Sequence, residues 1–364
     1  MKILLLGDYS NYQACLGKAL RKLGHDTTVA SDRAGWMNTE ANVSLKRPFA
    51  GPLGGAWLFA SMMGNRRLRG YDVVSLRCPA FVTLKPERLR YVFRQLKRYN
   101  GAVFLEGLST DKVMMDYLLS ADCGLRYHEY AYEGNSKALE SDRNWQKGAM
   151  ADYCEEVYDN VRGVTTALYE YQLAFGKRFG EDNTAYTGIP IDLSEVRPVD
   201  HAVGEGKIRM FLGRHRERQD VKGTDRIGAV AQQIARDYPD KCRLEIVENV
   251  PYKEYVEKLR WADLVLDQLY SYTPATNALL AMASGQATLS GGEPEYYDFI
   301  GEKELKPVIN AIPDEEKLYA TLRECVLNPQ IIKDAAAQGP EFVRRHNDSL
   351  LVARRHLDFW EKKI

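Results

Sequence analysis

The stretch IRMFLGRHRERQDVKGTDRIGAVAQQIAR, residues 208–236, contains an apolar segment, a charged loop and an amphipathic segment in succession. Five mostly apolar residues, 208–212, predict a short strand that Gly213 ends. A charged loop follows and closes near Lys222, after which apolar residues recur at helical spacing over 227–234. A strand, a basic loop and a helix N-terminus in this order are typical of an anion site in an α/β domain, because aligned peptide dipoles and free N–H groups favour negative charge.

Two side chains of this loop indicate which anion it could bind. Arg214 carries a forked, planar donor, and Lys222 carries a compact point charge. Together they fit a diphosphate better than a single carboxylate. The alternative is an ordinary solvated loop, which is the usual fate of charged residues that follow a strand.

The alternation of short apolar strands and helices extends in both directions from this stretch. In the second half we expect further strands at 243–247, 264–266, 287–290 and 308–310, and in the first half at 3–6, 26–30, 73–76, 102–105 and 163–166. Residues 198–206 are rich in proline, glycine and charge, which indicates a linker. The sequence therefore predicts an α/β protein of two Rossmann-like domains, 1–197 and 207–346, facing a central cleft.

Length, charge and cysteine content narrow the class of protein. A chain of 364 residues is long enough for two cores, and its 50 basic and 50 acidic side chains give no net charge that would point to nucleic acid. The six cysteines lie far apart, which argues against a disulfide framework and a zinc site and favours the cytoplasm. The first apolar run ends at Gly7, and 52–64 is too short for a membrane span, so we expect neither a signal peptide nor a transmembrane helix.

A dinucleotide site in the first half is the first alternative. Asp32 follows the second expected strand at about the place of a ribose-binding acid. The Rossmann fingerprint needs three glycines after the first strand, however, and only Gly7 is present. A nicotinamide-dependent oxidoreductase is therefore the weaker interpretation.

Acidic residues near the end of another first-half strand are candidates for acid–base chemistry. Glu106 follows the apolar run 102–105, and Asp111 lies five residues later. Ligands of open α/β sheets bind at the carboxyl ends of strands, so Glu106 could act as a general base or hold a sugar hydroxyl. A structural cap or a surface acid is the alternative for each of them.

Two segments of the first half are candidate interaction surfaces. Residues 46–98 contain twelve Lys or Arg against Asp72 and Glu87, together with aromatic and apolar residues such as Phe49, Trp57 and Leu58. Such a surface could dock on anionic lipid or grip an anionic acceptor, although a solvated basic helix is the alternative. Residues 127–160 are rich in acids and aromatics, as in lids over carbohydrate, but ordinary packing explains them equally well.

A second candidate anion site lies downstream. Thr276 and Asn277 open an expected helix, 278–283, that Gly285 ends. Their side chains can hydrogen-bond an anion at the helix N-terminus, or they can simply act as N-caps. Two such sites in one domain are what a nucleoside diphosphate needs.

These motifs occur in an order that resembles a known family. Gly213-Arg214, Lys222-Gly223, Asn277 to Gly285 and Gly291-Gly292-Glu293-Pro294-Glu295 resemble the donor domain of the retaining GT-B glycosyltransferases of family 4. The start of the chain, with Gly7 and residues 20–26, resembles their acceptor domain. The resemblance implies the GT-B architecture, with the terminal segment 347–364 packed back on the first domain.

The resemblance also implies roles for individual residues. Arg214 and Lys222 would hold the donor diphosphate, and the loop that carries Thr276 and Asn277 would hold phosphate. We expect further donor contacts from Gly7, Tyr272 and Glu295. The chain departs from the family at the two Glu positions of its motif, where Tyr272 and Leu280 stand here, and Glu106 stands where the family has His.

The function implied is metal-independent transfer of a hexose from a nucleotide sugar to a glycan or a lipid-linked acceptor in cell-surface polysaccharide biosynthesis. The reaction would retain anomeric configuration, with Glu106 or Asp111 as candidates for the side-chain base. The protein would be cytoplasmic and peripheral to the inner face of the membrane through residues 46–98. The alternative is a catalytically silent GT-B module that binds a nucleotide sugar or a glycan, as the changes at Tyr272 and Leu280 favour.

Overall fold

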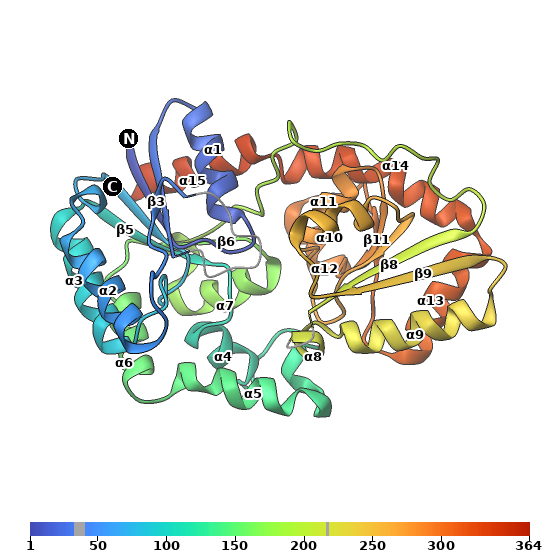
Figure 1. The fold of residues 1–364 in the computed structure, drawn as a ribbon, viewed down its shortest axis with the longest axis horizontal. Helices are drawn as coiled ribbons and strands as arrows, with labels where there is room; N and C mark the ends of the chain where they lie inside the picture. Colours follow the sequence, from blue (N-terminus) through green and yellow to red (C-terminus); the bar gives the residue numbers. More distant parts are fainter. Residues whose placement is uncertain (33–40, 216–217) are drawn as a thin grey trace. The chain divides into compact units, whose positions relative to one another are not determined.

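The computed structural model describes residues 1–32, 41–215 and 218–364 (Figure 1). The chain divides into two compact units. Unit 1 contains Met1–Gly124, Glu140–Asp192 and Ser349–Ile364, and unit 2 contains Leu125–Leu139 and Leu193–Asp348. Each unit is built on one parallel β-sheet with helices on its faces, so the α/β class expected from the alternating apolar runs is confirmed.

The sheet of unit 1 has the strand order β3-β2-β1-β4-β5-β6-β7. The order reverses between β1 and β4, which is a topological switch point of the Rossmann type. Its strands are β1 (Lys2–Leu6), β2 (Asp26–Ser31), β3 (Val43–Ser44), β4 (Val73–Leu76), β5 (Ala102–Gly107), β6 (Val164–Thr166) and β7 (Thr184–Tyr186). The central strands β1 and β4 are largely apolar, as expected where helices cover both faces of a parallel sheet.

The helices of unit 1 connect these strands, and α15 joins them from the far end of the chain. They are α1 (Tyr12–Lys22), α2 (Gly51–Gly64), α3 (Pro86–Tyr99), α4 (Lys112–Leu118), α6 (Gly148–Tyr158), α7 (Tyr169–Phe179) and α15 (Ser349–Lys363), while α5 (Ser136–Asp142) spans the boundary of the two units. Figure 1 shows α15 beside α1, where the Tyr12 hydroxyl lies 3.0 Å from Nε2 of His356. The rings of Phe359 and Trp360 lie 5.9 and 6.1 Å from that of Phe104, so α15 packs into the core of unit 1.

The sheet of unit 2 has the order β12-β11-β10-β8-β9, with a switch point between β8 and β10. Its strands are β8 (Ile208–Arg214), β9 (Cys242–Glu248), β10 (Leu264–Leu266), β11 (Ala287–Ser290) and β12 (Val308–Asn310). Its helices are α8 (Gln219–Lys222), α9 (Thr224–Asp237), α10 (Tyr252–Leu259), α11 (Thr276–Ala283), α12 (Pro294–Ile300), α13 (Glu315–Leu327) and α14 (Pro329–His346).

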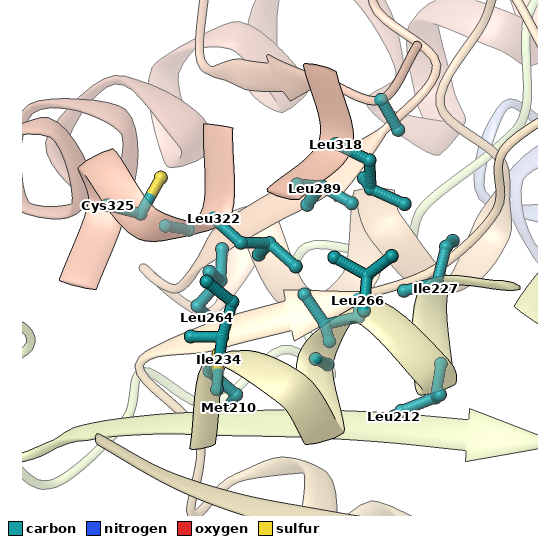
Figure 2. Packing of buried hydrophobic residues seen from close by; sticks show 14 of the residues in the cluster. Met210, Leu212, Ile227, Ile234, Leu264, Leu266, Leu289, Leu318, Leu322 and Cys325 are labelled. Carbon is teal, nitrogen blue, oxygen red and sulfur yellow. The ribbon is translucent and has the colours of Figure 1, made fainter. Parts of the chain in front are cut away.

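One large hydrophobic core fixes α9 and α13 against the sheet of unit 2. Figure 2 shows Met210, Leu264 and Leu289 of the strands packed against Ile234 of α9 and Leu322 of α13. Burying side chains of this size stabilises a fold by about 1.5–3 kcal/mol each relative to exposure. Through Ile227 and Leu212 the same core includes the amino-terminal half of α9 and the carboxyl end of β8.

The division into units differs from the expected domain boundaries in two places. The first boundary falls at Asp192, and residues 198–206 pack on unit 2 through the hydrogen bond from Val199 N to Ser284 O, 3.0 Å. The segment Leu125–Leu139, expected in the first domain, groups with unit 2. We call this segment the strap. It contains only short 3₁₀ turns at Glu129–Ala131 and Glu133–Asn135 before α5 begins.

Candidate functional site at the carboxyl edge of the second sheet

The carboxyl edge of the unit 2 sheet collects most of the residues that the sequence singled out. Arg214 is the last residue of β8, and Asp267 directly follows β10, so both border the switch point. Open α/β sheets bind ligands at this place, because the loops on either side of a switch point diverge and leave room. The side chains around it decide what that ligand could be.

Arg214 lies where an anion-binding guanidinium was predicted. Its Nη1 atom is 3.8 Å from the position that a Cβ atom on Gly228 would take, in the second turn of α9. The guanidinium is already engaged, because its Nη2 atom pairs with Glu248 at the end of β9. Its Nε atom is buried without a hydrogen-bond partner. Arg214 is thus held near the positive end of a helix with bonding capacity to spare.

Lys222 ends the short helix α8 and is exposed. The backbone of Lys222 is anchored to the segment after β10, since Leu269 N donates to Lys222 O at 2.9 Å. Gly223 follows with φ of +68°, and a Cβ there would meet Leu269 at 2.6 Å, so only glycine fits. The backbone therefore fixes the base of the Lys222 side chain at the entrance to α9.

Thr276 and Asn277 do not act as the N-caps that one interpretation expected. The N-cap of α11 is Ala275, with no side-chain cap, and both residues lie inside the first turn. The Asn277 side chain instead donates to Asp267 at 3.3 Å and accepts from the Tyr255 hydroxyl at 2.7 Å. Asp267 is buried and also accepts from Ser290 at 3.2 Å. These contacts place a polar cluster beside the switch point.

The strap covers the loops that follow β10 and β11. The backbone N–H of Arg126 donates to the Tyr272 hydroxyl at 2.5 Å, and the Tyr127 and Tyr272 rings lie 4.8 Å apart. The Arg126 guanidinium pairs with buried Glu293 and with half-buried Glu295. Two residues that the sequence proposed for the donor, Tyr272 and Glu295, therefore meet at a strap residue that it did not propose.

Glu293 is the centre of this contact, and it is 2% exposed. It accepts from the Tyr127 hydroxyl at 2.6 Å and from the Asn310 amide at 2.7 Å, besides its pair with Arg126. Burial raises the pKa of Glu293, but the hydrogen bonds from Asn310, Tyr127 and Arg126 outweigh it, and the net pKa is lowered. A charged carboxylate thus fastens the strap to unit 2.

In unit 1, Glu106 lies at the carboxyl end of β5 but inside the protein. Its side chain is 1% exposed and accepts from Ser75 Oγ at 2.6 Å and from Gln13 Nε2 at 2.5 Å. Burial raises its pKa to about 7 against those two hydrogen bonds. Gln13 also donates its backbone N–H to Asp8 at 3.1 Å, and burial raises the pKa of Asp8 to about 6.

Asp111, the other candidate base, caps a helix. It accepts from the backbone N–H groups of Val113 and Met114 at 2.9 and 3.2 Å and is 1% exposed. Burial raises its pKa to about 7. The structure brings neither Asp111 nor Glu106 to a surface.

Gly7 and Asp32 have structural partners in the same sheet. A Cβ on Gly7 would lie 2.7 Å from the Arg77 side chain, so a packed side chain occupies the space beside this glycine. Asp32 accepts from the backbone N–H and the hydroxyl of Thr83 at 2.9 and 2.7 Å. These contacts give Gly7 and Asp32 structural roles that do not require a bound dinucleotide.

The basic segment 46–98 is only partly a free surface. Several of its arginines serve the fold: Arg94 pairs with Glu156 at 2.6 Å, and Arg77 donates to the Asp8 carbonyl at 3.1 Å. The outward side of α2 is apolar, with Leu53 74% exposed, and Phe49 precedes the helix at 58% exposure. Within the described ranges, none of the helices has both the length and the apolar content that crossing a bilayer requires.

The six cysteines are free, and the described residues contain no group of three or more His, Cys, Asp or Glu side chains arranged to hold a metal ion. No family model matches the sequence, and no curated protein sequence matches it significantly.

Solved structures, in contrast, share the fold over the whole chain. One is sucrose-phosphate synthase from Thermosynechococcus elongatus, with a TM-score of 0.63 and 13% identity, covering 100% of this chain and 99% of that chain. Another is HepE from Anabaena in complex with UDP and glucose, with a TM-score of 0.59 and 12% identity, covering 99% of each chain. A third is a putative UDP-N-acetylglucosamine 2-epimerase from Listeria monocytogenes, with a TM-score of 0.55 and 12% identity, covering 98% and 94%. The chain therefore has the GT-B fold.

Proposed function

We propose that this protein is a glycosyltransferase that moves a hexose from a nucleotide-sugar donor to a glycan or lipid-linked acceptor. The observation that carries the proposal is Arg214, held at the β8/β10 switch point near the amino end of α9. The fold supports it too, because structures of similar fold include HepE, which was solved with UDP and glucose. We place the reaction in cell-surface polysaccharide biosynthesis, without a metal ion and with retention of configuration.

In this proposal Arg214 and Lys222 neutralise the diphosphate as it leaves, because fixed positive charges at developing negative charge lower the barrier. Thr276, Asn277, Tyr272 and Glu295 border the donor in unit 2. Gly7 of unit 1, predicted as a further donor contact, has the Arg77 side chain packed beside it. Glu106 and Asp111 are buried and already hydrogen-bonded, which favours a structural role over that of a side-chain base.

Arg214→Ala is expected to weaken binding of the preferred nucleoside diphosphate about tenfold or more, and Lys222→Ala somewhat less. A hydrogen bond between charged groups contributes about 1.5–3 kcal/mol, and about 1.4 kcal/mol corresponds to tenfold. Calorimetric titration with UDP, GDP, ADP, CDP and dTDP, first without and then with magnesium, measures this. Arg236→Ala is the matched control, because Arg236 is exposed at the other end of α9. Unchanged affinity in both site variants would contradict the diphosphate assignment.

A silent module is the second candidate, because Glu106 and Asp111 are enclosed and no base is assigned. Incubation with UDP-sugars and a panel of glycan and lipid-linked acceptors separates the candidates. Acceptor-dependent release of the nucleoside diphosphate supports the transferase. Binding without release supports the module, and conversion of the UDP-sugar without any acceptor would place the protein with the epimerases of the same fold.

We further propose that α2 docks on anionic lipid, as an acceptor at a membrane would require. Leu53 and Trp57 lie one turn apart on its outward side, and Lys46 and Arg66 flank it in exposed positions. Apolar side chains that enter the interface, with basic groups around them, are the usual composition of a peripheral membrane contact.

Vesicles test this contact. We expect the protein to sediment with vesicles of phosphatidylglycerol and phosphatidylcholine at low salt, and to be released as salt rises, because each basic group near an anionic surface contributes about 1 kcal/mol before screening. Leu53→Ser combined with Trp57→Ser should abolish sedimentation, whereas the exposed Leu327→Ser of α13 should not change it. Equal sedimentation with purely zwitterionic vesicles, or none at low salt, would contradict the proposal.

A further inference from the structure

Glu248 is a carboxylate in a place where a diphosphate site would ordinarily avoid one. It ends β9 and is the in-register partner of Arg214 on β8. The two side chains form an ion pair and are 24% and 23% exposed, so both reach the surface at the carboxyl edge of the sheet. A carboxylate this close to a bound diphosphate would repel it, unless it binds a different part of the same ligand.

The position of Glu248 in the topology indicates which part that is. In doubly wound sheets the phosphates lie at the end of the first strand, and an acid at the end of the second strand binds the ribose hydroxyls. In unit 2, β8 is the first strand and β9 the second, and they lie next to each other in the sheet. Glu248 at the end of β9 and Arg214 at the end of β8 repeat this arrangement.

The chemistry of the two groups agrees with the topology. An ionised carboxylate has two oxygens that only accept hydrogen bonds, so it pairs with the two hydroxyls of a ribose and not with phosphate oxygens. The guanidinium has five donors in a fork, enough to keep Glu248 on one side and phosphate on the other. Asn249, which follows with φ of +51°, turns the chain away at this point.

We propose that Glu248 binds the 2′ and 3′ hydroxyls of the nucleoside diphosphate and selects ribonucleotides. This inference rests on the proposed function, since it assigns a second part of the same donor. The competing role is purely structural: Glu248 would only hold Arg214 in place. Changing Glu248 would then weaken the binding of all phosphate ligands by a similar factor.

The test uses three ligands and Glu248→Gln. The ligands are the ribonucleoside diphosphate that wild type binds best, its 2′,3′-dideoxy analogue, and pyrophosphate. We expect wild type to prefer the ribonucleotide at least tenfold, and Glu248→Gln to lose most of that preference while binding pyrophosphate as well as wild type or better. Glu245→Gln is the matched control, because Glu245 also lies on β9 and pairs with Lys258 at 2.5 Å.

The remaining outcomes each contradict a definite statement. If Glu248→Gln keeps the ribose preference, or weakens the ribonucleotide and pyrophosphate by the same factor, the ribose assignment is wrong and the proposed function stands. If wild type binds a nucleoside diphosphate without preferring ribose, the ribose assignment is also wrong and the proposed function again stands. If wild type binds none of the three ligands, both the proposed function and the inference fail.

Discussion

Glu293→Ala is expected to lower the free energy of unfolding of unit 2 by about 2–4 kcal/mol. The substitution removes the acceptor of three groups at once, Arg126, Tyr127 and Asn310. A hydrogen bond to a charged group contributes about 1.5–3 kcal/mol, and a buried donor left without a partner costs about 1–3 kcal/mol. Arg126 is 57% exposed and can return to water, so its share of the loss is small.

A neighbouring residue offers a matched control for this prediction. Glu295 also pairs with Arg126, at 3.1 Å, but its side chain is 42% exposed. Glu295→Ala should therefore cost less than about 0.5 kcal/mol, as exposed ion pairs do. Urea denaturation measures both variants, and limited proteolysis reports on the strap, which should become cleavable between residues 125 and 139 in Glu293→Ala alone. Equal small losses in both variants would mean that the buried carboxylate does not fasten the strap.

The strap also shows where prediction from sequence ends. Arg126 and Glu293 are 167 residues apart, and no local sequence pattern around either residue predicts their contact. The run of acids and aromatics over 127–160 was visible in the sequence, but its division between two units depends on tertiary contacts such as the Tyr132–Tyr270 stack at 4.5 Å. Glu293 belongs to the motif Gly291-Gly292-Glu293-Pro294-Glu295 that was recognised in the sequence, but the burial of its side chain could not be inferred from that motif.

The sheets were far more predictable. Short, largely apolar segments predicted β4, β10, β11 and β12 to the residue, because a strand covered on both faces needs mostly apolar side chains. The sequence missed β3 and β7, which are two and three residues long at the edges of the unit 1 sheet. β3 (VS) and β7 (TAY) contain no apolar run, whereas β10 (LVL) is as short as β7 but wholly apolar.

Arg214 illustrates an intermediate case. The order of strand, loop and helix was enough to predict that its side chain lies near a helix N-terminus. Its pair with Glu248 follows from the parallel register of β8 and β9, which no local pattern specifies. The burial of Glu106 and Asp111 could not be predicted from local sequence either, because it depends on which helices pack over the end of the strand.

Glu106→Gln is expected to stabilise unit 1 by about 2 kcal/mol at pH 8 and to have little effect near pH 4.5. The folded-state pKa of Glu106 is raised from 4.5 to about 7, mainly by burial. The folded protein therefore holds this proton more tightly than the unfolded chain does, and wild type loses stability as pH rises from about 4.5 to about 7. One pKa unit corresponds to about 1.4 kcal/mol, and we take less than the full shift because the interior relaxes around a charge. A glutamine is never ionised, and it can direct its oxygen to Gln13 and its NH₂ to Ser75.

The difference between variant and wild type, measured by urea denaturation at several pH values, isolates this effect. His356 gives stability the opposite dependence on pH, because burial lowers its pKa to about 3 and the folded protein loses stability as pH falls below 6.5. This loss is the same in wild type and in Glu106→Gln, so it cancels in the difference. Asp111→Asn should behave like Glu106→Gln, since its pKa is also raised to about 7 and asparagine also caps helices. Glu87→Gln, at an exposed position of α3, is the control for the chemical change itself. If Glu106→Gln is as destabilising at pH 8 as at pH 4.5, Glu106 is charged and well satisfied in the folded protein, and its hydrogen bonds outweigh its burial.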